Sequence, residues 1–170
     1  MSSSVNVIRN LGVLVPAVEN RTAKYDEIYS EHCHRIYSLA FWMTDNELTA
    51  EQLSSNAFLR AFASSAEPRT EQIDQAFLAE IREITAIGTL TLNSGISAET
   101  KSVRGNVKRV HLERAVVQLP ATEKMIFLLH DVEGYEHEKI ARLLGMTMQE
   151  SQFGLHQARL QMRELISRMS

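Results

Sequence analysis

Apolar residues recur at steps of three and four through the first half of the chain, which is the period of an amphipathic helix. This pattern predicts helices over residues 25–43, 50–63 and 70–87. Thr49 is predicted to cap the second helix, and Pro68 separates the second helix from the third. No stretch alternates between apolar and polar residues in the manner of a strand, so the chain is predicted to be all-α.

The second half of the chain contains shorter helical stretches with sharper boundaries. They are predicted at residues 110–118, 122–132, 136–144 and 147–168, with Thr122 as the cap of the second stretch. Gly145 suits the left-handed conformation that ends a helix, and Thr147 with Glu150 has the spacing of a capping box. Two helices joined by this glycine turn predict a helix-turn-helix, which occurs in DNA-binding proteins and in plain helical bundles alike.

A polar stretch without helical period, residues 88–107, is predicted to be a linker that contains at most a short helical piece. It divides the chain into an N-terminal arm (1–22), a first helical domain (23–87) and a second helical domain (108–170). We therefore expect two small helical domains, a three-helix bundle and a helix-turn-helix. The sequence leaves open whether the apolar arm packs on the first domain, covers a binding face or stays loose.

Charge is distributed unevenly along the chain, whose net charge is −3 over 170 residues. Residues 66–100 carry two basic and six acidic side chains, whereas residues 101–170 carry eleven basic and eight acidic ones. Binding to nucleic acid requires local cations that displace counterions from phosphate. Only the second half of the chain therefore fits a nucleic-acid partner.

Composition and motif searches exclude several other classes of protein. One cysteine cannot form a disulfide framework, and no apolar run approaches the roughly 18 residues of a membrane span, so a cytoplasmic protein is expected. His32, Cys33 and His34 are consecutive on a predicted helix, where side chains point about 100° apart, so no metal site is expected. No nucleophile motif, phosphate-binding loop or carboxylate pair stands out, so neither catalysis nor a cofactor is expected.

Short motifs in both halves of the chain follow a recognisable order and spacing. In the second half they are Leu119-Pro120, the run FLLHDVEGY at 127–135, HEKIA at 137–141, Leu144-Gly145 and LHQAR at 155–159. In the first half they are YDEIY at 25–29, RIYSLA at 35–40 and AFLRAF at 57–62. The first-half motifs resemble the start of domain 2, and the second-half motifs resemble domain 4, of the extracytoplasmic-function (ECF) sigma factors.

The resemblance implies an alternative sigma factor, which binds core RNA polymerase and directs transcription initiation at particular promoters. Domain 2 would bind the polymerase clamp and open the minus-ten element, and the positions for the clamp contact are Gln52, Asn56 and Arg60. Domain 4 would place its last helix in the major groove at the minus-thirty-five element. The residues expected to face this promoter DNA are Thr147, Gln149, Gln152, His156, Gln157 and Arg159. An anti-sigma factor is a further implied partner.

The first half departs from the family on the surfaces that would contact polymerase and promoter. Gln52, Ser55 and Asn56 stand where the family usually has an Asp and a Gln-Glu pair, so the carboxylates are missing. In the next helix, Ala79 and Glu80 replace an aromatic and a basic residue. That helix would have to meet single-stranded DNA, for which aromatic stacking and cations supply the affinity.

The last helix is also less basic than in the family, because Gln152, Gly154 and Gln157 replace basic residues. Each lost phosphate contact lowers the salt-dependent part of DNA binding. Two alternatives to a working sigma factor therefore stay open. One is a sigma-like adapter or decoy, which binds an anti-sigma factor or polymerase without opening promoters. The other is a helix-turn-helix regulator in which only the second domain contacts DNA.

Overall fold

A computed structural model describes residues 4–92 and 107–169, and every regular element within these ranges is a helix. The elements are α1 (Ser4–Thr44), α2 (Glu47–Ser64), α3 (Thr70–Ile84), α4 (Arg109–Gln118), α5 (Ala121–Phe127), the π-helical turn η1 (Leu128–Val132), α6 (His137–Leu144) and α7 (Met148–Met169). The predicted all-α fold is confirmed.

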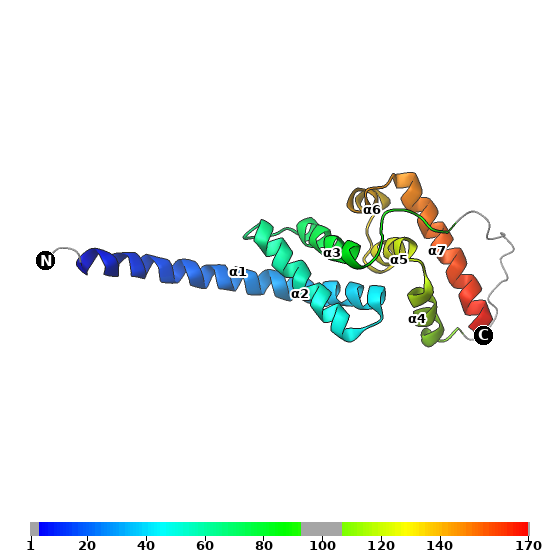
Figure 1. Ribbon diagram of the computed structural model, residues 1–170, viewed down its shortest axis with the longest axis horizontal. Coiled ribbons are helices and arrows are strands. Elements are labelled where there is room, and N and C mark those ends of the chain that lie inside the picture. Colours follow the sequence, from blue (N-terminus) through cyan, green and yellow to red (C-terminus); the bar gives the residue numbers. More distant parts are fainter. Residues whose placement is uncertain (1–3, 93–106, 170) are drawn as a thin grey trace.

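Helices α1, α2 and α3 form the first helix group, which surrounds a continuous apolar core. Ile36 and Leu39 of α1, Phe58 of α2, and Phe77 and Ile81 of α3 are almost inaccessible to water and belong to this core. Burial of one such side chain is worth about 2 kcal/mol, so the core holds the three helices together. Figure 1 shows α2 and α3 packed along the C-terminal part of α1, while the N-terminal part of α1 extends well beyond them.

Helices α4 to α7 and the turn η1 form the second helix group. Met125, Leu129, Ile140 and Leu155 are buried at its centre. The long helix α7 packs on α4, α5 and α6, so it is the element that ties the group together. Figure 1 shows α7 running along the whole side of this group, from α6 at one end to α4 at the other.

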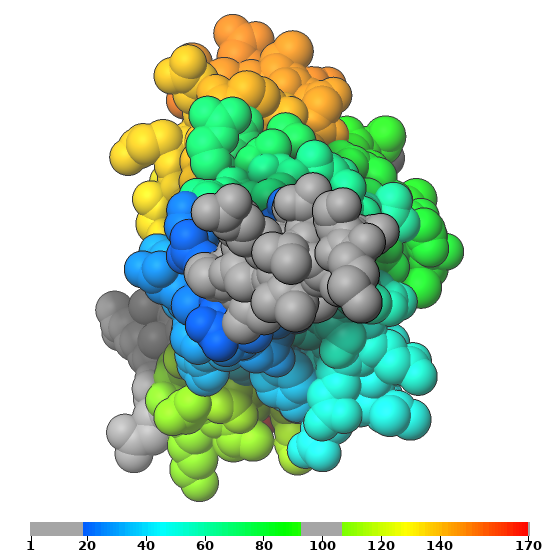
Figure 2. Space-filling model, turned by 90° about the vertical axis from the view of Figure 1, so that its left-hand side faces the viewer, coloured from blue at the N-terminus to red at the C-terminus, as the bar shows by residue number. Residues whose placement is uncertain are grey.

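The two helix groups share a packed boundary. Helix α3 contacts α6, and the C-terminal part of α1 contacts α4 and α5. Figure 2 shows both neighbours: α6 and the start of α7, in yellow and orange, lie beyond α3, and α4, in lime, lies beside α1. The buried apolar cluster contains side chains from both groups, so the groups are joined by apolar packing as well as by surface contacts.

The N-terminal arm is part of α1, which the sequence pattern predicted to begin only at residue 25. The helical backbone starts at Ser4 and runs without interruption to Thr44. Val5, Ile8 and Leu11 recur at three-residue steps, which is a helical spacing that continues into the rest of the helix. The start predicted at residue 25 was wrong, because the prediction used only the stretch in which the apolar period is strongest.

Two predicted helix caps were wrong. The cap of α2 is Asn46, whose side-chain oxygen accepts a hydrogen bond from the N–H of Thr49 at 2.9 Å. A cap residue bonds an N–H two or three positions later, so Thr49 is the bonded residue rather than the cap. Helix α5 begins after Pro120, and the buried Thr122 instead accepts a hydrogen bond from the N–H of Gly88 at 3.3 Å.

The remaining sequence predictions concern the linker, membrane spans and metal sites. Residues 88–92 of the predicted linker contact α5, whereas the short helical piece expected within residues 93–106 falls outside the described residues. None of the described helices combines the length and the apolar character needed to cross a membrane. Among the described side chains, no three His, Cys, Asp or Glu residues are grouped so that they could hold a metal ion.

Candidate nucleic-acid interface

Helix α6, a short turn and α7 form a helix-turn-helix. Gly145 ends α6 with a φ of 68°, the left-handed conformation that glycine adopts without strain. The Thr147 N–H donates to Glu150 Oε2 at 2.7 Å, and the Glu150 N–H donates to Thr147 Oγ1 at 3.1 Å. The structure thus has both the glycine turn and the capping box that the sequence predicted, and Thr147 lies at the N-terminal end of α7.

The outward face of α7 is built from residues at steps of three and four. This face includes the exposed side chains of Gln149, Gln152, Phe153, His156 and Arg159. Four of these five side chains were expected at this surface, and the structure places them together on one face. Phe153, which is 41% exposed, was missed. Its position, four residues after Gln149 and three before His156, was the signal that could have found it.

Gln157 was expected to face outward, and this expectation was wrong. Its side chain is only 5% exposed, and its Oε1 atom has no hydrogen-bond partner among the described residues. Successive helical residues point about 100° apart, so the residue that follows the exposed His156 is turned toward the core. Gln157 therefore cannot contact DNA in this conformation.

Arg159 lies on the exposed face of α7, but its guanidinium is already paired. Its Nε donates to Asp131 Oδ2 at 3.0 Å, and its Nη2 donates to Asp131 Oδ1 at 2.6 Å. Partial burial acts to raise the pKa of Asp131, but hydrogen bonds from Arg159 and His130 outweigh it and lower that pKa. The charge of Arg159 is thus partly neutralised, whereas Arg163, four residues further along α7, is an exposed cation.

Helix α2 presents the face that the resemblance assigned to the polymerase clamp. Gln52 and Asn56 are exposed there, as that assignment requires. Leu48 and Leu59 flank them and are 65% and 67% exposed. Because Leu48, Gln52 and Leu59 are separated by four and seven residues, they lie along one stripe of the helix. The face is therefore polar at its centre and apolar at both ends, without a carboxylate among these four residues.

Arg60 is engaged within the first helix group. Its Nε donates to Glu80 Oε1 at 2.6 Å and its Nη2 donates to Glu83 Oε1 at 2.7 Å. These hydrogen bonds raise the pKa of Arg60, and the one that Arg60 donates to Glu80 has the larger effect. The carboxylate at position 80, a departure from the family pattern, thus serves as the partner of the arginine that was expected to contact polymerase.

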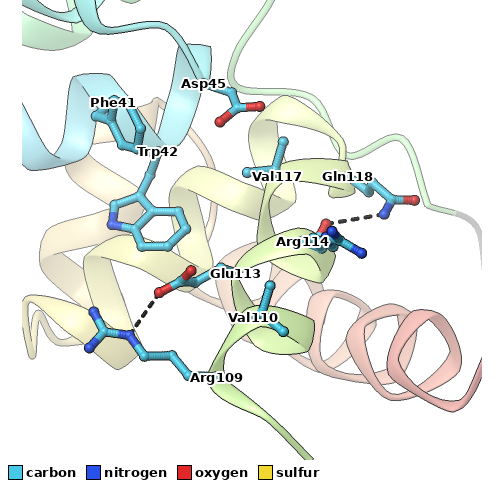
Figure 3. Close-up of a pocket in the computed structure, with 9 residues that line it drawn as sticks. All are labelled: Phe41, Trp42, Asp45, Arg109, Val110, Glu113, Arg114, Val117 and Gln118. Atoms are coloured by element: carbon cyan, nitrogen blue, oxygen red, sulfur yellow. Dashed lines mark hydrogen bonds and ion pairs between the residues drawn. The ribbon is translucent and has the colours of Figure 1, made fainter. Parts of the chain in front are cut away.

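A pocket of about 530 Å³ lies between the end of α1 and α4. Figure 3 shows Phe41 and Trp42 on one wall, facing Val110 and Glu113 of α4. At its rim, Arg109 Nε donates to Glu113 Oε1 at 2.7 Å. Trp42 is the single tryptophan of the sequence, so its fluorescence reports on the boundary between the two helix groups.

Comparison with known proteins identifies the family to which this helix-turn-helix is related. Residues 109–162 match the sequence model of the family Sigma-70, region 4. Over 162 residues the chain is 25% identical to the ECF RNA polymerase sigma factor SigE of Mycolicibacterium smegmatis, a match that covers 86% of this chain and 63% of SigE. The chain is a homologue of ECF sigma factors. It spans less than two thirds of the length of SigE.

Two further proteins are similar to this chain, one in sequence and one in fold. The ECF sigma homologue is 21% identical over 155 residues to the RNA polymerase sigma factor YlaC of Bacillus subtilis, covering 82% of this chain and 90% of YlaC. Its fold is similar to that of the sigma factor RpoE of Bartonella quintana, solved in complex with the anti-sigma factor NepR. That match has a TM-score of 0.57 at 14% identity and covers 82% of this chain and 96% of RpoE.

We expect two histidines, His32 in α1 and His137 at the start of α6, to make the stability of the ECF sigma homologue depend on pH. Burial lowers the pKa of both His32 and His137 from 6.5 in the folded state. The unfolded chain then binds more protons than the folded chain below about pH 6.5, so stability is full above that pH and falls below it. We expect the thermal unfolding midpoint, measured by circular dichroism, to fall between about pH 7.5 and pH 5.5.

The variant His137→Gln is the matched control for this prediction. It removes one titrating group, and an amide can still bond Ser151 Oγ, which lies 2.9 Å from His137 Nδ1. The variant should lose less stability on acidification than the wild type. Burial raises the pKa of Glu133, so this residue changes the pH dependence of stability in the opposite direction. Its effect is the same in both proteins. Parallel pH curves for the two proteins would contradict the role of His137.

Proposed function

We propose that this ECF sigma homologue is an alternative sigma factor that binds core RNA polymerase and directs promoter-specific transcription initiation. In this proposal, region 4 reads the minus-thirty-five element with α7. The protein is regulatory rather than catalytic, and it acts with polymerase in the cytoplasm. The observation that carries the proposal is the region 4 match over residues 109–162, which includes the helix-turn-helix of α6 and α7, with an exposed face of amide and aromatic side chains on α7.

The chemistry of that face favours the reading of adenine and thymine. The amides of Gln149 and Gln152 can form paired hydrogen bonds with the N6 and N7 atoms of adenine. The ring of Phe153, between them and His156, can contact the methyl group of thymine. We place Thr147 at the phosphate backbone, because it lies at the N-terminal end of α7, where N–H groups and the helix dipole attract anions.

The variants Gln152→Ala and Phe153→Ala should each weaken binding to the selected promoter by roughly 5- to 100-fold, which corresponds to about 1–3 kcal/mol. Both side chains are exposed, so neither substitution should lower the unfolding temperature appreciably. Affinity should be measured at fixed salt, with chain and core polymerase together, on a promoter and on a scrambled duplex. Unchanged affinity in both variants would remove α7 from promoter recognition.

Arg159→Ala is the matched comparison for these variants. Because Arg159 also holds Asp131, its loss should lower both DNA affinity and stability. If Arg159 contacts a phosphate, its loss should in addition make binding less dependent on salt, with the logarithmic slope reduced by about one. A lower unfolding temperature with unchanged affinity and salt dependence would show that Arg159 has only a structural role.

For polymerase, we propose that the exposed face of α2 makes the clamp contact through Gln52 and Asn56, with apolar support from Leu59. We assign Arg60 to the clamp contact from its sequence position alone, because its guanidinium already donates hydrogen bonds to Glu80 and Glu83. An anti-sigma factor is a further proposed partner. An adapter or decoy that does not open promoters is the alternative function, favoured by the missing carboxylates on α2 and by Glu80, but it is not better supported by the comparisons.

A further inference from the structure

Helix α3 is joined to α6 by polar contacts across the boundary between the helix groups. Arg142 Nε donates to Glu71 Oε1 at 2.9 Å, and its Nη2 is 3.4 Å from the other carboxylate oxygen. Near the opposite end of α3, Arg82 Nη2 donates to the carbonyl oxygen of Leu143 at 3.1 Å. Helix α6 therefore covers a face of α3, the helix that, by resemblance, would meet single-stranded promoter DNA.

Between these two contacts lies a buried carboxylate that both groups share. Asp74 is 3% exposed, and Arg35 of the first group donates to its Oδ1 atom at 2.5 Å. From the second group, Tyr135 Oη donates to Asp74 Oδ2 at 2.7 Å and accepts from Arg35 at 3.1 Å. Lys139 Nζ lies 3.8 Å from the same Oδ2 atom and 3.5 Å from the centre of the Tyr135 ring. Separation of the groups would thus remove two of the three partners of Asp74.

A second link is the segment that follows α3. The N–H groups of Thr91 and Leu92 donate to Glu123 Oε1 at 2.6 and 2.7 Å. Glu123 is fully buried in α5, and its Oε2 atom has no hydrogen-bond partner among the described residues. A buried carboxylate is costly unless it accepts hydrogen bonds, so these two N–H groups bind the segment firmly to the second group.

Gly154 makes room for the same segment on α7. A side-chain Cβ atom at this position would lie 2.7 Å from Leu90 Cδ2 and 2.6 Å from Ile126 Cδ1, both far closer than van der Waals contact. Leu90 is partly buried against the apolar core. The glycine that replaces a basic residue of the family pattern therefore leaves the space that the Leu90 side chain occupies.

These contacts are incompatible with simultaneous binding of both promoter elements. The two elements are separated by about 25 base pairs, or about 85 Å at 3.4 Å per base pair. In the structure, α3 and α6 are in hydrogen-bond contact. We propose that the free chain holds itself closed with an intramolecular latch, which consists of the contact of Arg142 with Glu71, the contacts around Asp74 and the docked residues 88–92, and that the latch must open for promoter binding. This inference rests on the proposed function.

Release of residues 88–92 also determines how far the helix groups can separate. With this segment docked on the second group, only residues 85–87 connect it to α3, and a fully extended chain of that length spans about 10 Å. With it released, residues 85–108 connect them and can span about 85 Å. Opening of the latch therefore extends the reach of the linker to the separation of the two promoter elements.

The latch can be tested in the full-length free chain by distances between two spin labels. The labels are attached to Glu51→Cys in α2 and Arg163→Cys in α7, both exposed sites, in a Cys33→Ser background. The latch variant is Tyr135→Phe with Arg142→Glu, which removes the hydroxyl at Asp74 and places a carboxylate opposite Glu71. The matched control adds Glu71→Arg to this variant and restores an ion pair at the exposed site.

The wild type should give one narrow distance distribution, and the latch variant a broad one shifted to longer distances at unchanged helix content. The added Glu71→Arg should shift the distribution back toward that of the wild type. Trp42 fluorescence, which reports on α1 and α4, should change in parallel. Long distances in the wild type, or a narrow distribution in the latch variant, would overturn the latch. Neither DNA nor polymerase is present, so this result does not depend on the proposed function.

Discussion

Replacement of Glu80 by arginine should lower the thermal unfolding midpoint of the chain by roughly 10 °C, because it removes a buried carboxylate that pairs with Arg60 and buries a positive charge in its place. The Glu80 side chain is 9% exposed and accepts a hydrogen bond from Arg60 Nε at 2.6 Å, whereas the Arg60 side chain is 43% exposed. An arginine at position 80 would place a second positive charge beside Arg60 at this buried position. The substitution would restore the charge that the family usually has there, yet it should destabilise this protein.

The matched control exchanges the two residues. Glu80→Arg combined with Arg60→Glu keeps one charge of each sign, so it should regain most of the lost stability. The measurement is thermal unfolding followed by circular dichroism, with all three proteins at the same pH and salt. If Glu80→Arg alone were as stable as the wild type, position 80 would be free to vary and the pair would have no structural role.

A large loss of stability is also expected for Arg35→Met, of about 3 kcal/mol in the free energy of unfolding. The substitution keeps most of the apolar stem of the side chain but leaves the Asp74 carboxylate, which is 3% exposed, without its closest partner. Tyr135 and Lys139 would remain beside the carboxylate and limit the loss. Urea unfolding at neutral pH gives the free energy directly.

Removal of both charges shows whether the loss of stability in Arg35→Met comes from the unpaired Asp74 carboxylate or from lost packing. In the double variant Arg35→Met with Asp74→Asn, no charge is left buried, so most of the stability should return. A double variant no more stable than Arg35→Met would show that lost packing, rather than the unpaired charge, causes the effect. Full stability of Arg35→Met itself would contradict the structural importance of the contacts around Asp74.

Local features of the fold were predictable from the sequence because they depend on residues close together in the chain. The helical periods, the left-handed Gly145 and the capping box of Thr147 and Glu150 are all of this kind. The outward positions of Gln149 and Gln152 follow from the same period. The burial of Gln157 could not be predicted from this period, because the pattern of one helix does not show how far neighbouring helices cover it.

Features that join distant parts of the chain could not be predicted in this way. The partners of Asp74 are separated from it by 39 and 61 positions, and those of Glu123 by 31 and 32. Glu80 and Gly154 had seemed to weaken a sigma factor, since each replaces a basic residue. The structure gives each a partner, Arg60 and Leu90 respectively, that no local pattern indicates.

Run-off transcription is the measurement that decides whether the chain directs promoter-specific initiation. Purified core RNA polymerase would be supplied with this protein and with fragmented DNA of its own genome. We expect discrete new transcripts that require the protein and share a sequence upstream of their start sites. No new transcript, together with no core polymerase retained in a pull-down, would exclude a sigma factor and favour the sigma-like decoy.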